Sequence, residues 1–374
     1  MNLHEQYGLT PVINAWGTAT VYGVSRVPKP VVEQVALAMG EYVDMEELEH
    51  RAGEEIARHS GAPWGCVTHC TAAAITLATA ACMTGRDRAA INRLPDSTGL
   101  PDRVLIQAGH CVNYGHEITQ AVRLAGARSE VVGSVNQCDP GVLADKLAEA
   151  DVAAVLVVDS HLTVRHGMVA LEDIVALAHA AGKPVIVDAA AQDLRLRELV
   201  TTGADLILVS AQKYLRAPTA GLVAGRRDLV EALAMQHRGI GRAMKPSKEG
   251  IIGVLAALAY RQSEPRADWI KLRVDRVART LRGLKGLENL EVTAVPDPTG
   301  CPFERVRIRP IPTASPLDAP ALASALAAGT PKVAVGAHYA DLGYLNLEVN
   351  ELDNEEIDQL VARLTHLLKD DSEG

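Results

Sequence analysis

Two buried segments that end in polar residues decide the fold. The first is Pro184-Val185-Ile186-Val187-Asp188-Ala189-Ala190-Ala191, and a polar, helix-like segment follows over residues 193–201. The second is Asp205-Leu206-Ile207-Leu208-Val209-Ser210-Ala211-Gln212-Lys213. The pattern predicts two parallel strands joined by a helix. Because ligands bind at the carboxyl edge of open α/β sheets, we expect Asp188 and Lys213 to meet in a ligand site.

A carboxylate and an amine at one sheet edge are the groups that pyridoxal phosphate needs. Lys213 can condense with the cofactor aldehyde as a Schiff base, and Asp188 can pair with the pyridine nitrogen and keep it protonated. Helix capping would explain the aspartate alone, and solvation would explain the lysine alone. The ordered pair, with Ser210 and Gln212 directly ahead of the lysine, favours the cofactor.

A run of small residues earlier in the chain is the candidate phosphate site. The stretch Gly65-Cys66-Val67-Thr68-His69-Cys70-Thr71-Ala72-Ala73-Ala74 opens an apolar helix expected to reach about Met83. Free N–H groups at a helix start attract anions, and a threonine hydroxyl can add a donor. Taken alone, the stretch would also suit a capped core helix, but beside Asp188 and Lys213 it predicts phosphate binding.

Strand and helix patterns alternate regularly between residues 103 and 226. This alternation predicts an α/β fold with a mostly parallel sheet covered by helices on both faces. The expected strands are Val104–Ala108, Glu130–Val132, Ala153–Val158 and Leu222–Ala224, and the expected helices are Glu117–Leu124, Pro140–Glu149 and Leu171–Ala181.

His110 lies just past the predicted strand Val104–Ala108, at the same edge as Asp188. Its imidazole could stack on the cofactor ring, and Asn113 is the competing candidate. A histidine at a helix entry that only contacts water is the other interpretation, and the sequence does not separate the three.

The length of 374 residues favours a large and a smaller domain. We expect an N-terminal arm (residues 1–30), a large cofactor-binding domain (31–237) and a small C-terminal α/β domain (238–374). The last includes an interdomain loop and helices over 238–285. Arms of this kind pack against the small domain or a partner subunit.

A basic loop stands out in this acidic chain. The segment Arg238-Gly239-Ile240-Gly241-Arg242-Ala243-Met244-Lys245-Pro246-Ser247-Lys248 holds four cations and no acid. Such loops recruit anionic substrates, although a solvated linker would have the same composition. Arg305, Arg307 and Arg309 share one face of a predicted strand. One of them could bind a substrate carboxylate, but a solvated outer face is the favoured interpretation.

Composition limits the partners. The net charge of −9 and the absence of a basic tail argue against nucleic-acid binding. Residues 1–5 lack the features of a signal peptide, and the longest apolar run, Thr71–Met83, is too short for a membrane span. We therefore expect a cytoplasmic enzyme that does not bind membranes.

The six cysteines do not predict a metal site. Cys66, His69 and Cys70 are followed later by His110-Cys111 and His116. This spacing matches no standard zinc motif, and free buried thiols are common in large cytosolic enzymes.

Several short motifs, in their order and spacing, resemble one enzyme family. They are Val12-Ile13-Asn14-Ala15 with Gly17-Thr18, Tyr42-Val43-Asp44-Met45-Glu46-Glu47-Leu48, Val187-Asp188-Ala189-Ala190, Gln212-Lys213 with Arg216 and Pro218, and Gly241-Arg242-Ala243-Met244-Lys245. The chain resembles fold-type I pyridoxal phosphate enzymes of the selenocysteine synthase-like branch, and within it the D-glucosaminate-6-phosphate ammonia-lyase family. The likeness runs from about Pro11 to Tyr260.

The resemblance implies the cofactor contacts and the assembly. Lys213 would carry the cofactor, Asp188 would contact the pyridine nitrogen, and Cys70, Thr71 and Ala72 would lie under the phosphate. It implies a homodimer or larger homo-oligomer with shared active sites. The further candidates are His110, Ala190, Ser210 and Gln212 for the cofactor, and Arg216 and Arg242 for the substrate.

The resulting prediction is a pyridoxal phosphate lyase acting on an anionic amino acid. Lys213 removes the α-proton, a β-substituent leaves, and ammonia and a 2-keto acid are released. An aminotransferase or racemase shares the early steps, and a catalytically inactive binding module on the same scaffold is the alternative from another class. Two departures near the cofactor, His69-Cys70-Thr71-Ala72 and Arg216-Ala217-Pro218-Thr219, leave the substrate open.

Overall fold

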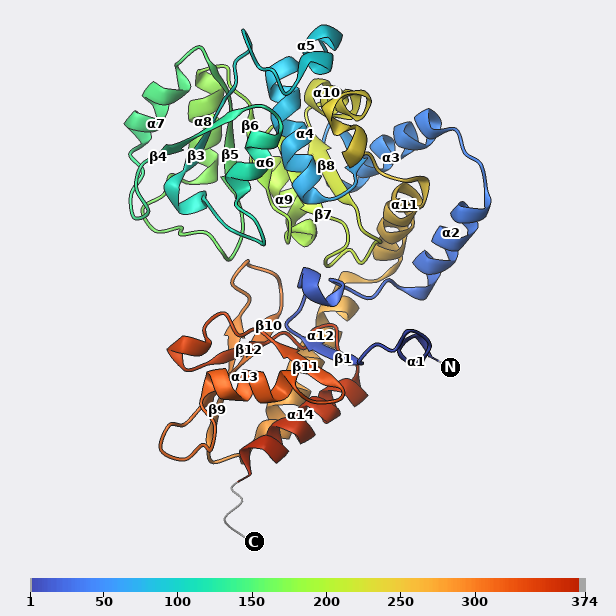
Figure 1. Ribbon diagram of the computed structural model, residues 1–374, viewed down its shortest axis with the longest axis vertical. Helices are drawn as coiled ribbons and strands as arrows, with labels where there is room; N and C mark the ends of the chain where they lie inside the picture. The colour runs from blue at the N-terminus through green and yellow to red at the C-terminus, as the bar shows by residue number, and fades with distance from the viewer. Residues whose placement is uncertain (1, 370–374) are drawn as a thin grey trace. The chain divides into compact units, whose positions relative to one another are not determined.

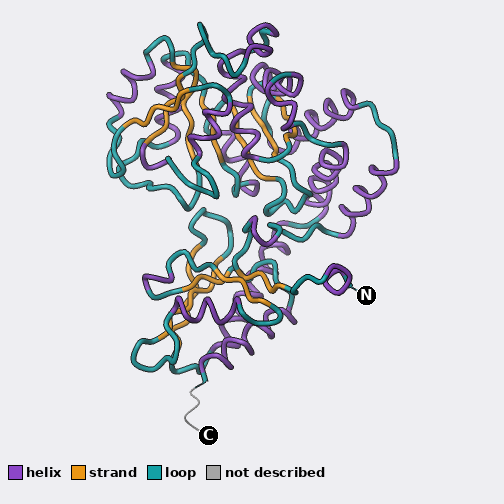
Figure 2. Tube along the Cα trace, viewed as in Figure 1, coloured by secondary structure: helices purple, strands orange, loops and turns teal. Residues whose placement is uncertain are grey.

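The protein, described here by a computed structural model over residues 2–369, divides into two compact units. The larger unit is Val27–Ser263, and the smaller combines the N-terminal residues up to Arg26 with those from Glu264 onward. Figure 1 labels the helices and strands of each unit, and Figure 2 shows that both mix helices with strands.

Residues 27–263 build one seven-stranded sheet in the order β2-β8-β7-β6-β5-β3-β4. Strand β8 runs antiparallel to both of its neighbours, and the other strands all run in one direction. This is the mostly parallel sheet that the sequence predicted. The strands are β2 (Trp64–Thr68), β3 (Arg103–Gln107), β4 (Arg128–Val132), β5 (Val152–Val158), β6 (Val185–Asp188), β7 (Leu206–Ser210) and β8 (Gly221–Gly225).

Helices cover both faces of this sheet (Figure 1). They are α2 (Lys29–Gly40), α3 (Met45–Ser60), α4 (Thr71–Thr84), α5 (Arg88–Arg93), α6 (Ile118–Leu124), α7 (Pro140–Leu147), α8 (Leu171–Ala180), α9 (Leu196–Thr201), α10 (Arg227–Met235) and α11 (Lys248–Ser263). One apolar cluster joins α3, α7, α8, α9 and α11 to the first face. A second cluster joins α4, α6 and α10 to the other face.

Local sequence explains how two of these helices begin and end. The Asp44 carboxylate accepts hydrogen bonds from the N–H groups of Glu46 (2.9 Å) and Glu47 (3.1 Å), so it caps α3. Gly61 ends the same helix in the left-handed conformation, which glycine adopts without strain. Helix α4 is rich in alanine and threonine and almost entirely buried, because it packs between α6, α10 and the sheet.

The smaller unit has its own core. Strands β12 (Leu345–Leu347), β10 (Glu304–Pro310) and β9 (Leu290–Pro296) form an antiparallel sheet, and β1 (Val12–Ala15) pairs with β11 (Lys332–Val335) in parallel. Its helices are α1 (Leu3–Tyr7), α12 (Arg266–Leu284), α13 (Ala319–Ala327) and α14 (Asn354–Leu368). The pairing of β1 with β11 makes the N-terminal arm part of this unit.

The division between units differs from the expected boundary at residues 237 and 238. Helix α11 buries Ile251, Val254 and Leu258 in the apolar cluster of the larger unit, so that unit extends to Ser263. The segment before it, expected as an interdomain loop, folds into short 3₁₀ helices at Gln236–Arg238 and Ile240–Met244. No helix among residues 2–369 is long and apolar enough to cross a bilayer.

Candidate active site

Strands β6 and β7 bring the predicted residues to one edge. The Ala189 N–H donates to the Leu208 carbonyl (2.9 Å), and the Ser210 N–H donates to the Ala190 carbonyl (3.0 Å). These bonds continue the pairing of the two strands past Asp188. Ser210 is therefore fixed beside Ala190, and Lys213 follows it after one turn.

Asp188 is a buried carboxylate in an environment that favours a cation. Its side chain is only 6% exposed, and its Oδ1 accepts a hydrogen bond from the Ala190 N–H (3.2 Å). Burial raises the pKa of Asp188 to about 6, and the positive charge of nearby Lys213 opposes this rise. The two residues singled out by the sequence are thus electrostatic neighbours.

The loop that carries Lys213 is held at both ends. The Lys213 N–H donates to the Ser210 carbonyl (3.3 Å), and the Ala217 N–H donates to the Ala211 carbonyl (2.9 Å). Arg216 adopts a positive φ of 60°, which is uncommon for a residue with a side chain. Its guanidinium lies 5.6 Å from the centre of the Tyr260 ring. The half-buried Gln212 and Lys213 are therefore presented by a fixed turn.

The predicted phosphate turn lies where β2 ends and α4 begins. Cys70 caps the helix, its Sγ accepting from the Ala73 N–H (3.5 Å), and Ala72 lies in the first turn. The Thr71 hydroxyl oxygen is buried and has no hydrogen-bond partner among the described residues. Gly221 of β8 lets the turn approach closely, since a Cβ there would lie 2.7 Å from the Cys70 carbonyl carbon. Buried N–H and hydroxyl donors at this turn suit an anion.

His110 is held as a neutral ring at the end of β3. Its Nδ1 accepts a hydrogen bond from the Val158 N–H (3.0 Å), so the ring proton is on Nε2. Burial lowers the pKa of His110 to about 4, and Arg165 adds to this effect. The exposed Asn113 instead uses its Oδ1 to accept from the Gly115 N–H in its own turn (3.0 Å). Of the two ring-stacking candidates, His110 has the environment of a buried flat partner.

Tyr114 is a further candidate for the site that the sequence did not single out. The pKa of its hydroxyl is raised by partial burial and, to a smaller extent, by Asp188 and Cys70. The ring is 39% exposed and packs edge-on to His116, with centroids 4.7 Å apart. An aromatic residue in the loop after β3 was the available signal.

Asp159 at the end of β5 adds a second acidic residue. Its N–H donates to the Asp188 carbonyl (2.8 Å). Its carboxylate pairs with Arg165 (2.9 Å) and Arg195 (3.0 Å). The sequence did not predict this cluster, because the two arginines lie in an irregular loop and a short 3₁₀ helix.

The basic segment that contains Arg242 borders the phosphate turn, because the His69 N–H donates to the Met244 carbonyl (3.0 Å). Arg238 in the same basic segment pairs with Glu46, and Lys248 donates to backbone carbonyls. Arg242 is exposed and forms no ion pair with another residue in the range 2–369. It is available to an anion.

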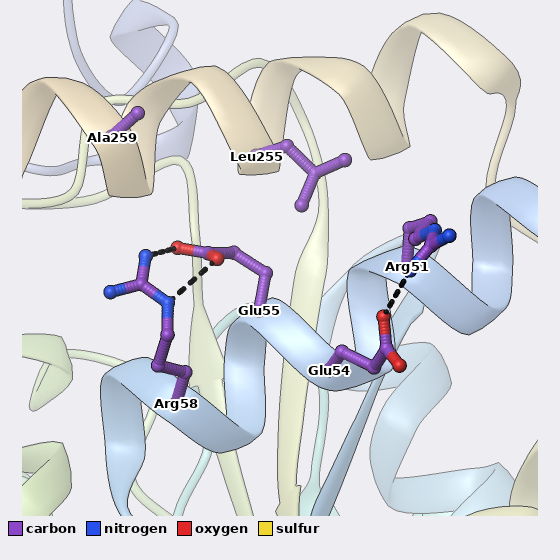
Figure 3. A pocket seen from close by; sticks show the side chains of 6 residues that line it. All are labelled: Arg51, Glu54, Glu55, Arg58, Leu255 and Ala259. Carbon is purple, nitrogen blue, oxygen red and sulfur yellow. Dashed lines mark hydrogen bonds and ion pairs between the residues drawn. The ribbon is translucent and has the colours of Figure 1, made fainter.

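Pyridoxal phosphate fits this set of residues. Asp188 supplies a buried anion, Lys213 an amine next to it, and the Thr71 turn an unsatisfied hydroxyl beside free N–H groups. No group of three or more metal-ligating side chains occurs within residues 2–369. A surface pocket of about 540 Å³ lies elsewhere, between α3 and α11, and Figure 3 shows that its arginines pair with its own glutamates.

The fold is that of fold-type I pyridoxal phosphate enzymes, as predicted. An aspartate aminotransferase from Thermotoga maritima has the same fold, with a TM-score of 0.55 at 16% identity over 97% of this chain and 93% of its own. The chain belongs to the L-seryl-tRNA selenium transferase family, whose profile matches residues 12–274. This membership confirms the predicted resemblance.

Two relatives match almost the whole chain. A D-glucosaminate-6-phosphate ammonia lyase of Salmonella typhimurium is 35% identical over 98% of both chains. A 5'-C-glycyluridine monooxygenase-decarboxylase of a Streptomyces species is 32% identical over 98% of this chain and 92% of its own. The solved structure of a D-glucosaminate-6-phosphate ammonia-lyase matches with a TM-score of 0.90 at 33% identity over 98% of both chains.

Proposed function

We propose that this protein is a pyridoxal phosphate-dependent ammonia-lyase that acts on an anionic amino acid. The observation that carries the proposal is the buried Asp188 carboxylate facing the charge of Lys213 at the carboxyl edge of the sheet. The ammonia lyase among the relatives supports this reaction class, since it matches the chain from end to end. The products would be ammonia and a 2-keto acid.

Asp188 would hold the pyridine nitrogen of the cofactor in its protonated form. When bound, the cofactor supplies an electron sink for the carbanion left at the substrate Cα. A cation against Asp188 lowers the pKa of this carboxyl and restores its charge at neutral pH. The residues Ala190 and Ser210 fix the backbone on which this carboxylate sits.

The turn Cys70-Thr71-Ala72 would hold the cofactor phosphate. The Thr71 hydroxyl gains its missing hydrogen bond there, and the first N–H groups of α4 gain an acceptor. His110 would lie against the ring as a neutral imidazole, because its low pKa keeps it uncharged at pH 7. Tyr114 would complete the wall between the phosphate and the carboxylate ends.

Lys213 would move the proton. Its Nζ is the candidate base that removes the substrate α-proton, and the fixed turn from Ser210 to Ala217 keeps it in place. Gln212 precedes it in the same turn. The elimination follows if the proton stays on Nζ or passes to the leaving group. Its transfer to another carbon would give transamination, and its return to the opposite face of the substrate Cα would give racemisation.

Substrate recognition is assigned to Arg242, which is exposed beside the phosphate turn. Its guanidinium suits bidentate contact with carboxylate or phosphate. Arg216 is the second candidate, although its guanidinium also lies over the Tyr260 ring. The phosphorylated sugar acid in the name of the ammonia lyase relative supports an anionic substrate.

Two further proposals concern assembly and compartment. We propose a homodimer or larger homo-oligomer with shared active sites, supported by the exposed apolar side chains Val32, Leu37 and Met39 on α2 and Tyr42 after it. We also propose a cytoplasmic enzyme, supported by six free cysteines. The acidic charge supports a small-molecule substrate rather than a nucleic acid.

The test is product analysis of the purified enzyme with D-glucosaminate 6-phosphate. Ammonia and a keto acid in equal amounts, without an added keto acid acceptor, are the expected result. Turnover that needs an added keto acid would indicate an aminotransferase, and carbon dioxide release with oxygen uptake would indicate the decarboxylase chemistry named for the Streptomyces relative. A colourless protein that binds no cofactor would favour an inactive binding module.

A further inference from the structure

The loop between β5 and α8 projects one arginine at the carboxyl edge of the sheet. Asp159 opens this loop, and its N–H is bonded to the Asp188 carbonyl (2.8 Å). Arg165 lies six residues later and is 57% exposed at its side chain, while one of its Nη atoms contacts Asp159 at 2.9 Å. Its positive charge contributes to the lowered pKa of His110, the neutral ring at the end of β3. Arg165 therefore lies next to the residues assigned to the cofactor.

The loop is fixed by backbone contacts on both sides of this arginine. The Val164 N–H donates to the Gly109 carbonyl (2.9 Å), and the Cys138 N–H donates to the Gly167 carbonyl (2.8 Å). Gly109 permits the approach, because a Cβ there would lie 2.5 Å from the Val164 carbonyl oxygen. A cation on a fixed loop loses less conformational entropy when it binds a ligand than one on a mobile segment.

The two arginines that contact Asp159 differ in their other partners. Two guanidinium groups share its single carboxylate, and Arg195 has a second partner in Glu198 at 2.6 Å. Arg165 forms no other ion pair among the described residues. The exposed Arg165 guanidinium is held in direction by Asp159 and can use its remaining N–H donors on a ligand.

We propose that Arg165 is a specificity-determining residue that binds an anionic oxygen group of the substrate, and that Asp159 positions its guanidinium. The inference rests on the proposed function and assigns to that site a second anion contact besides Arg242. The anionic group is a carboxylate or a phosphate, which share the geometry that a guanidinium recognises.

The test measures binding without turnover. D-gluconate 6-phosphate, D-gluconate and D-glucitol 6-phosphate lack the amine, so they bind without reacting. Their dissociation constants are measured by calorimetry on the cofactor-loaded wild type, Arg165→Gln and Arg165→Lys. Arg128→Gln is the matched control, because Arg128 is also exposed (62%) and paired with a carboxylate (Asp102, 2.7 Å) but starts β4 at the opposite edge of the sheet.

We expect Arg165→Gln to weaken the binding of gluconate 6-phosphate at least tenfold and Arg165→Lys to retain part of the lost affinity. Arg128→Gln should bind this ligand as tightly as the wild type. If Arg165→Gln also weakens the binding of gluconate, Arg165 contacts the carboxylate. If it also weakens the binding of glucitol 6-phosphate, Arg165 contacts the phosphate. Either result supports the inference. Equal affinities in Arg165→Gln and Arg128→Gln overturn it while the proposed function stands. A wild type that binds none of the three ligands overturns the inference, whereas the proposed function is tested separately by the product analysis.

Discussion

Replacing Asp188 by asparagine should affect the cofactor-free protein and the loaded enzyme in opposite directions. In the cofactor-free protein, burial raises the pKa of Asp188 from 3.8 to about 6. The folded state therefore holds the proton more tightly than the unfolded state, and the charged carboxylate destabilises the fold above pH 6. The difference between the two pKa values corresponds to about 3 kcal/mol of folding free energy.

An asparagine side chain at this position carries no charge, so Asp188→Asn should be more stable than the cofactor-free wild type by about 3 kcal/mol at pH 8. The gain should shrink as the pH falls below about 6, become small near pH 4 and vanish at lower pH, where the aspartate is protonated in both the folded and the unfolded state. Urea unfolding of the two stripped proteins at pH 8 and pH 4 measures this difference.

The loaded enzyme should lose activity. A cation about 4 Å from a carboxylate gains about 4 kcal/mol at an effective dielectric constant near 20, and losing this interaction slows turnover about a thousandfold. Ammonia release from D-glucosaminate 6-phosphate is the assay. A stripped Asp188→Asn protein that is less stable than the wild type at pH 8, or a loss of activity below tenfold, would mean that Asp188 is a structural cap rather than the partner of a cation.

Three more substitutions test other parts of the site. Thr71→Ala should weaken cofactor binding about tenfold or more, since a hydrogen bond to a charged group contributes about 1.5–3 kcal/mol. Thr79→Ala is the matched control, because the Thr79 hydroxyl is also buried and without a hydrogen-bond partner but lies in the middle of the helix. Equal cofactor affinities in the two variants would remove Thr71 from the phosphate site. Arg242→Ala should raise KM for the substrate and leave cofactor affinity unchanged, and poor cofactor binding at constant KM would assign this arginine to the cofactor phosphate instead. Gly221→Ala should weaken cofactor binding and lower the free energy of unfolding by about 1–3 kcal/mol, because the added Cβ would press on the Cys70 turn. Unchanged cofactor affinity, measured by titration, would show that the turn does not need this close approach.

The sequence predicted those parts of the molecule that local patterns determine. Asp188 and Ser210 end their strands as expected, since the apolar runs before them are short and unbroken. The Thr71 turn was found because small residues before a buried helix are visible in the sequence itself.

Other features depend on contacts between distant segments. The segment around Gly241 was expected to be a loop between domains, yet it packs against α4, where a Cβ on that glycine would collide with the Leu77 side chain. Tyr114 and Arg165 lie in loops after β3 and β5, and loop residues carry no periodicity that marks their direction. Only the parallel register of β3, β5 and β6 brings these loops to the edge that Asp188 occupies.

The most direct test of the central claim is the covalent attachment of the cofactor to one lysine. The enzyme is loaded with pyridoxal phosphate, reduced with borohydride, digested and mapped by mass spectrometry. We expect a phosphopyridoxyl group on Lys213, and none on the Lys213→Ala variant, whose circular dichroism should equal that of the wild type. A modification confined to another lysine, or no modification at all in the wild type, would contradict the assignment of this site.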